Sequence, residues 1–216
     1  MTAAQKTVGV FALQGDVREH MHVLTCLGAR TRPVRRPADL VGLDGIVLPG
    51  GESSVMDRLA RIMGLKAPLA DAIRDGLPAY GTCAGMILLA AGIENPAPGQ
   101  GSLGVLDVTV RRNAFGTQVD SFEADLAVPA VSADPVHAVF IRAPAVVRVG
   151  EGVEVLAEVP ASRMVASGAP APHHHDDAAP ASAVPVAVRA GHVLATSFHP
   201  EVTGDWSFHR EFLAGL

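Results

Sequence analysis

The chain is organised around the stretch Ala79-Tyr80-Gly81-Thr82-Cys83-Ala84-Gly85-Met86. An apolar run leads into a cysteine flanked by small residues, and an apolar helix is predicted immediately after it, from Met86 to Ala91, with Gly92 as its end. The stretch predicts a strand, a sharp turn and a helix, with the thiol at the turn. A cysteine at a helix N-terminus is favoured as the thiolate, which is the nucleophilic form. The alternative is that Cys83 is a small buried hydrophobic residue, as free cysteines often are.

Strands and helices alternate through the part of the chain that precedes Cys83. Strands are predicted at 7–13, 29–34, 45–48 and 77–81, and helices at 17–27, 55–63 and 68–75. This alternation is typical of a parallel sheet with right-handed crossovers, in which the carboxyl ends of the strands carry the active site. Gln14, the pair Gly50-Gly51 and Cys83 each follow a predicted strand. We therefore expect them to lie together at one edge of the sheet.

The segment Pro49-Gly50-Gly51-Glu52-Ser53-Ser54 is the second informative loop. Two glycines allow backbone N–H groups to face outward just before a helix, an arrangement that binds an anion or a developing oxyanion. The alternative is an ordinary strand-to-helix turn in which a serine is the N-cap.

His199 and Glu201 lie two residues apart at the end of another predicted strand, 193–198. Alternate residues of an extended chain share a face, so both side chains are expected to point the same way. A histidine oriented by a carboxylate is a suitable general base for a thiol. Taken singly, His199 is more simply a strand-end histidine, and Glu201 is more simply a surface glutamate. Together with Cys83 they predict a Cys–His–Glu triad.

The second half of the chain has a different character. Short β-like runs are predicted at 103–110, 122–128, 136–142, 146–149, 153–159 and 184–189, and a last helix at 206–216. Residues 161–185 are rich in Ala and Pro and predict a low-complexity surface insertion. The insertion holds His173, His174 and His175, but consecutive residues rarely form a closed metal shell, so no metal site is expected there.

Composition favours one compact domain over residues 1–216 and excludes several function classes. The chain has 216 residues, 49% of them hydrophobic, and a formal net charge of −5. No basic patch suggests a nucleic-acid partner, and no apolar run is long enough to span a membrane. Two cysteines, Cys26 and Cys83, are expected to be reduced, as in a cytoplasmic protein, with Cys26 in the core.

Short motifs are spread nearly end to end along the chain. They are Leu13-Gln14-Gly15, Arg18-Glu19-His20, Leu48-Pro49-Gly50-Gly51-Glu52-Ser53, Gly81-Thr82-Cys83-Ala84-Gly85, Arg112-Asn113-Ala114-Phe115-Gly116, Gln118-Val119-Asp120-Ser121-Phe122-Glu123-Ala124-Asp125, Phe140-Ile141-Arg142-Ala143-Pro144 and Ser197-Phe198-His199-Pro200-Glu201. With this set the chain resembles the class I glutamine amidotransferases, and among them the glutaminase subunits of pyridoxal 5′-phosphate synthase. The insertion at 161–185 is the main departure from the resemblance.

The resemblance implies an α/β three-layer sandwich with a mostly parallel, mixed central sheet. It implies that Cys83 attacks the side-chain amide of L-glutamine, that His199 moves the proton and that Glu201 orients His199, through a thioester intermediate. The implied glutamine-binding residues are Gly51, Glu52, Ser53, Arg112, Ile141 and Arg142, and the implied oxyanion hole is formed by Gly51 and Ala84 with Gln14 nearby. A guanidinium group is well suited to the α-carboxylate of glutamine.

The resemblance also implies a protein partner. The ammonia would pass to a synthase subunit that builds pyridoxal 5′-phosphate, while this chain would bind no cofactor itself and would be poorly active alone. The remaining alternatives are a glutaminase for another synthase, a γ-glutamyl hydrolase, and a non-catalytic binding module on the same fold.

Overall fold

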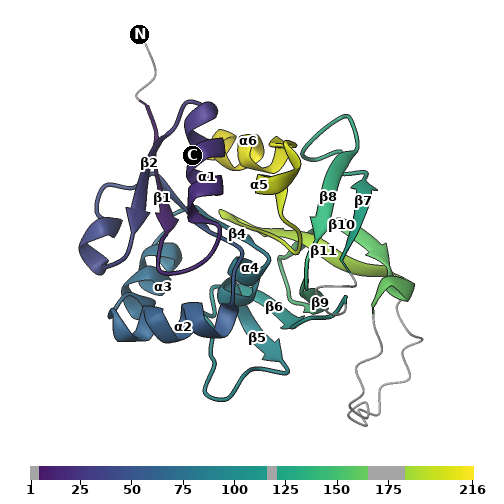
Figure 1. Ribbon diagram of the computed structural model, residues 1–216, viewed down its shortest axis with the longest axis horizontal. Helices are drawn as coiled ribbons and strands as arrows, with labels where there is room; N and C mark the ends of the chain where they lie inside the picture. Colours follow the sequence, from purple (N-terminus) through teal and green to yellow (C-terminus); the bar gives the residue numbers. More distant parts are fainter. Residues whose placement is uncertain (1–4, 116–120, 165–182) are drawn as a thin grey trace.

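The computed structural model describes residues 5–115, 121–164 and 183–216, and a seven-stranded sheet runs through its middle (Figure 1). In spatial order the strands are β10 (Glu154–Pro160), β11 (Ala183–Ala190), β12 (Val193–Thr196), β4 (Ala79–Thr82), β3 (Gly45–Leu48), β1 (Thr7–Phe11) and β2 (Arg30–Val34). The strands from β12 to β2 are parallel, and β11 is antiparallel to both of its neighbours. The predicted α/β fold with a mostly parallel, mixed sheet is confirmed.

Helices cover both faces of the sheet and make it the middle of three layers (Figure 1). On one face, Val8, Val10 and Val47 of the sheet share a core with residues of α1 (Val17–Cys26) and α6 (Ser207–Ala214). On the other face, Phe11, Ile46 and Leu48 pack with residues of α2 (Ser53–Ile62) and α3 (Lys66–Arg74). Strands buried on both faces are continuously apolar, which is why the sequence shows no alternation there.

The second half of the chain adds two small sheets beside the main one. The strands β5 (Ala90–Glu94), β6 (Leu106–Arg111) and β9 (Ala145–Val149) form the first, and the hairpin of β7 (Phe122–Leu126) and β8 (Val136–Phe140) forms the second. Phe140 of the hairpin packs on Phe198 with ring centroids 5.5 Å apart, and Phe198 packs on Phe208 at 5.4 Å. These aromatic contacts attach the hairpin to the core beneath the C-terminal helices.

Two local predictions are wrong. The helix after Cys83 is α4 (Ala84–Leu89), and Ala90 turns into extended backbone because residues 90–94 pair with β6 as strand β5. Gly92 therefore lies inside a strand and does not end a helix. Cys26 is exposed, because α1 buries the stripe formed by His20, Val23 and Leu24, and Cys26 lies off that stripe.

The remaining short elements are the 3₁₀ helices η1 (Pro37–Leu40) and η3 (Ala161–Arg163) and the helix α5 (Pro200–Thr203). The predicted insertion at 161–185 thus begins with η3 and ends in β11, and residues 165–182, with His173 to His175, lie outside the described residues. Among the helices of the described ranges, none is long and apolar enough to cross a membrane. The division into a single domain stays a prediction.

Candidate active site

Cys83 occupies a strained turn between β4 and α4. Its backbone has φ 48° and ψ −104°, a conformation that residues other than glycine rarely adopt. The Cys83 N–H donates a hydrogen bond to Thr196 O at 2.8 Å, which ties the turn to β12. A Cβ added at Gly85 would lie 2.0 Å from Leu48 O, so the small residues after Cys83 are needed where the turn passes over β3.

His199 and Glu201 form a buried pair close to this turn. His199 Nδ1 lies 2.7 Å from Glu201 Oε1, and the two side chains are 7% and 0% exposed. The predicted reason for their alignment is wrong, because β12 ends at Thr196 and His199 is the N-cap of α5, with Pro200 in its first turn. The side chains meet across the start of a helix and not along a strand.

The charge state of His199 is set by its neighbours. Burial works to lower the pKa of His199, but the neighbouring Asp16, Cys83 and Glu201 outweigh it and raise that pKa to about 12. Burial raises the pKa of Glu201, and the hydrogen bond with His199 opposes that rise. His199 Nε2 is buried and has no hydrogen-bond partner within the described ranges. A protonated His199 beside Cys83 is the arrangement that stabilises a thiolate.

Asp16, which the sequence analysis does not select, lies beside the same histidine. Asp16 Oδ2 is 3.6 Å from His199 Nδ1, and the Asp16 N–H donates to Gly50 O at 3.1 Å. The signal that could select Asp16 as a site residue is its position directly after Gln14-Gly15, beyond the end of β1. Ligand atoms of Asp16, His199 and Glu201 lie within 4.8 Å of one another, so these are the residues that could offer atoms to a cation.

The loop Gly50-Gly51-Glu52 is clamped by Gln14. The Glu52 N–H donates to Gln14 Oε1 at 2.7 Å, and a Cβ added at Gly51 would lie 2.5 Å from the same oxygen. Gly51 has φ 152°, which favours glycine. The N-cap of α2 is Glu52, whose carboxylate accepts from Ser54 N at 3.4 Å, so the alternative of a serine cap is wrong. Gln14 and Glu52 thus hold the backbone of Gly51 beside the thiol pocket.

A cavity of about 240 Å³ opens over Cys83 and His199. All of the predicted site residues line it except Gln14 and Glu201, which lie behind Gly51 and His199; those that line it are Cys83, His199, Gly51, Glu52, Ser53, Ala84, Arg112, Ile141 and Arg142. The lining residues that the sequence did not indicate are Asp16, Ile87, Asn113 and Val202. The volume suits a small polar molecule.

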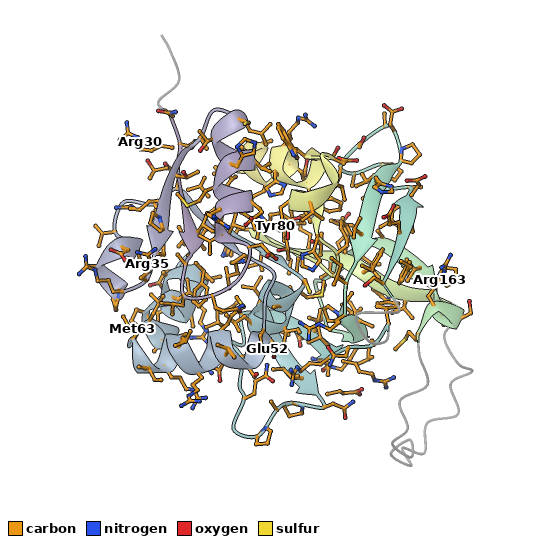
Figure 2. All side chains as sticks on the ribbon, in the orientation of Figure 1. Arg30, Arg35, Glu52, Met63, Tyr80 and Arg163 are labelled. Carbon is orange, nitrogen blue, oxygen red and sulfur yellow. The ribbon has the colours of Figure 1, made fainter. Side chains whose placement is uncertain are left out.

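Charged groups line the same cavity as the thiol. Arg112 Nη2 donates to Glu52 Oε1 at 2.9 Å, and its side chain is 14% exposed, so Arg112 is held in the cavity wall and is not a solvated surface arginine. Figure 2 labels Glu52, the N-cap residue of α2. Arg142 has φ 47°, and the carbonyl oxygen of the preceding Ile141 lies 3.9 Å from Cys83 Sγ.

The fold and this thiol site define the chain as a glutamine amidotransferase. A crystal structure described as a glutamine amidotransferase superposes with a TM-score of 0.80 at 45% identity, covering 96% of this chain and 97% of the other. PurLQS from Thermotoga maritima shares the fold at 17% identity, with a TM-score of 0.64 over 97% of this chain and 98% of that one.

The chain belongs to the SNO glutamine amidotransferase family, whose sequence profile matches residues 10–215. It is 56% identical over 206 residues to the pyridoxal 5′-phosphate synthase subunit PdxT of Clavibacter michiganensis subsp. michiganensis, covering 95% of this chain and 88% of that protein. It is 53% identical over 211 residues to the PdxT subunit of Leifsonia xyli subsp. xyli, covering 98% of this chain and 96% of that protein.

Proposed function

We propose that this chain is a glutaminase that hydrolyses L-glutamine to L-glutamate and ammonia and supplies the ammonia to a pyridoxal 5′-phosphate synthase subunit. The observation that carries the proposal is the combination of a strained Cys83 turn with a His199 ring whose Nδ1 is fixed by Glu201 and whose Nε2 has no partner in the described ranges. The choice of synthase is supported by the similar proteins from Clavibacter and Leifsonia, which are subunits of pyridoxal 5′-phosphate synthase.

In the first half of the reaction, the thiolate of Cys83 adds to the side-chain carbonyl carbon of glutamine. The carbonyl oxygen takes the negative charge, and His199 Nε2–H gives its proton to the amide nitrogen. The carbon–nitrogen bond then breaks, ammonia leaves, and a γ-glutamyl thioester remains on Cys83. Glu201 keeps the imidazole in the tautomer and orientation that this transfer needs.

In the second half, His199 takes a proton from water as the water attacks the thioester carbon. The carbon–sulfur bond breaks, glutamate is released, and the thiolate and the imidazolium are restored. The oxyanion of both tetrahedral states is met by the N–H groups of Gly51 and Ala84, with Gln14 holding the Gly51 loop. One such donor contributes on the order of 3 kcal/mol to the transition state.

Substrate recognition is assigned to the charged wall of the cavity. Arg112 and Arg142 meet the α-carboxylate of free glutamine, because a guanidinium group binds a carboxylate strongly. Glu52 holds Arg112 in place through the 2.9 Å contact. Ser53 and the Ile141 backbone complete the binding segment.

The same proposal also assigns the domain organisation, the cellular location and the partner of the chain. The chain is a single glutaminase domain of the cytoplasm that works in a complex with the synthase subunit and binds no pyridoxal phosphate itself. The alternatives are a glutaminase for a different synthase and a γ-glutamyl hydrolase.

The test is ammonia release from L-glutamine with and without the synthase subunit. Wild-type activity that rises strongly with the subunit and disappears in Cys83→Ala is the expected result. Cys26→Ala is the matched control, because Cys26 is exposed and is expected to leave activity unchanged. Strong activity that ignores the subunit would favour the hydrolase or another synthase, and no activity in either condition would refute the proposal.

A further inference from the structure

Two buried histidines lie next to the triad and do not line the cavity. His20 of α1 and His209 of α6 are both fully buried. His20 Nδ1 lies 2.9 Å from His209 Nε2, and His20 Nε2 lies 3.1 Å from Thr82 Oγ1 and 3.5 Å from Glu201 Oε2. His20 thus contacts both the triad carboxylate and the residue that directly precedes Cys83.

The hydrogen-bond needs of these groups select one arrangement of the protons. Glu201 Oε2 is buried and has no hydrogen-bond partner within the described ranges, and His20 Nε2 lies 3.5 Å from it. A proton on His20 Nε2 would direct an N–H group at this oxygen. If His20 carried its proton on Nδ1 instead, a lone pair would face the carboxylate. His209 would then need its own proton on Nδ1, which is buried without a partner among the described residues. An orphaned buried N–H group is costly, so both rings carry the proton on Nε2.

The surroundings keep both rings neutral. Burial, followed by the neighbouring His209 and His199, holds the pKa of His20 well below its usual range, and burial lowers the pKa of His209 to about 4. The two rings face each other, His199 and Glu201 at the start of α5, and Thr82 and Tyr80 of β4. The Tyr80 ring meets His209 edge-on, with centroids 5.6 Å apart. Figure 2 shows Tyr80 near the centre of the molecule. The Glu201 carboxylate therefore faces a neutral His20 ring on this side.

We propose that His20 is a positioning residue of the active site, which shares its Nε2–H between Glu201 Oε2 and Thr82 Oγ1 and so fixes the triad acid relative to the strand that carries Cys83. His209 donates to His20 Nδ1 and thereby selects the tautomer of His20. The inference rests on the proposed function, since it assigns a further role within the same site. It extends the triad to a chain that runs from His209 through His20 and Glu201 to His199.

The position of His20 predicts which kinetic constant it affects. His20 does not line the cavity, so glutamine binding should be independent of it. Losing its N–H leaves Glu201 Oε2 without a donor, and a carboxylate without donors takes up a proton more readily. A neutral Glu201 stabilises the His199 imidazolium less, so the thiolate of Cys83 would form only at higher pH.

The experiment compares His20→Leu, His20→Gln and the control His22→Leu in the complex with the synthase subunit. His22 lies on the same helix but is exposed, so it controls for replacing a histidine of α1. We expect kcat in His20→Leu to fall about 10- to 100-fold, as for a lost hydrogen bond to a charged group, with KM unchanged. In a Cys26→Ala background, the pH profile of Cys83 alkylation should shift toward higher pH in His20→Leu. It should return toward wild type in His20→Gln, whose amide restores a donor.

Different results separate this inference from the proposed function. A His20→Leu variant that keeps the wild-type alkylation profile and kcat, or a His20→Gln variant that restores neither, would overturn the positioning role. Nitrogen NMR of the wild-type protein gives a readout that needs neither activity nor a variant. We expect His20 and His209 to be neutral and protonated on Nε2, and a His20 ring protonated on Nδ1 would overturn the inference. If wild-type protein releases no ammonia, the proposed function is refuted. The NMR tautomers of His20 and His209 still test the positioning role of His20.

Discussion

His199 Nδ1 lies 2.7 Å from Glu201 Oε1 in a setting from which water is almost entirely excluded. In such surroundings the hydrogen bond both fixes the ring and stabilises its charged form. The two residues are only two positions apart in the sequence, but their contact depends on the turn from β12 into α5.

Glu201→Gln should lower kcat for ammonia release by about 10²- to 10⁴-fold, because the amide keeps the size of the side chain but removes the charge that orients His199. Steady-state kinetics in the complex measure the effect. Glu211→Gln is the matched control, since Glu211 pairs with Arg189 and lies outside the cavity. A kcat within threefold of wild type in Glu201→Gln would remove Glu201 from the triad.

Gly51→Ala should lower kcat at least about tenfold, because the new Cβ would lie 2.5 Å from Gln14 Oε1 and must displace the loop. Gly64→Ala is the control: Gly64 also has a positive φ, of 61°, but a Cβ there meets nothing within 4 Å. It should cost about 1–2 kcal/mol of unfolding free energy and leave kcat unchanged. Equal losses of kcat in the two variants would show that the Gly51 backbone has no special role.

Arg112→Met should raise KM for glutamine about 10- to 100-fold, as expected when a charge-assisted hydrogen bond to a carboxylate is lost. The effect on kcat should be smaller, because the proposed role of Arg112 is to bind the α-carboxylate and not the reacting amide. Arg111→Met is the neighbouring control, since Arg111 pairs with Glu94 and does not line the cavity. An unchanged KM in Arg112→Met would contradict the assignment of the α-carboxylate to this side chain.

Asp57→Asn should lower the free energy of unfolding at neutral pH by about 2–3 kcal/mol. Asp57 is almost fully buried between Arg61, 3.1 Å away, and Lys66, and it accepts from the Gly101 N–H at 3.0 Å. Although burial alone would raise the pKa of Asp57, the bonds from Lys66 and Gly101 and the charge of Arg61 lower it below its ordinary value.

The sign of the pH dependence follows from that depressed pKa. The stabilisation is fully present above the ordinary Asp value of about 4, and it is lost as the pH falls from there through the lower pKa of the folded state. Denaturant titrations from pH 7 to pH 3 should therefore bring wild type and Asp57→Asn together. Asp71→Asn, which breaks an exposed pair with Arg74, should cost no more than about 1 kcal/mol at any pH. A difference between wild type and Asp57→Asn that grows toward acid pH would refute the account.

Most of the elements could be predicted from local patterns, and the errors have identifiable causes. Helix α4 ends at Leu89 because the following residues find a strand partner in β6, which lies further along the chain. The helical context of Cys26 alone predicts a place in the core, but the face that α1 buries is decided by what packs on it.

The cavity residues could be predicted from motifs, but their supporting contacts could not. The clamp of Gln14 on Glu52 joins the ends of β1 and β3. Asp16 and His20, at the start of α1, contact His199 and Glu201, and His209 of α6 contacts His20. No local sequence pattern predicts contacts between segments so far apart along the chain.

By itself, the sequence determined the alternation of strands and helices, the glycines and the cysteine of the two active-site loops, and the presence of a histidine and a carboxylate two residues apart. These features depend on local sterics and on apolar periodicity, which act over a few residues. Only the tertiary structure decided the raised pKa of His199, the burial of Glu201 and the neutral histidines behind it. Those properties arise from desolvation and from charges brought within a few ångströms by the sheet, and both exist only once the chain has folded.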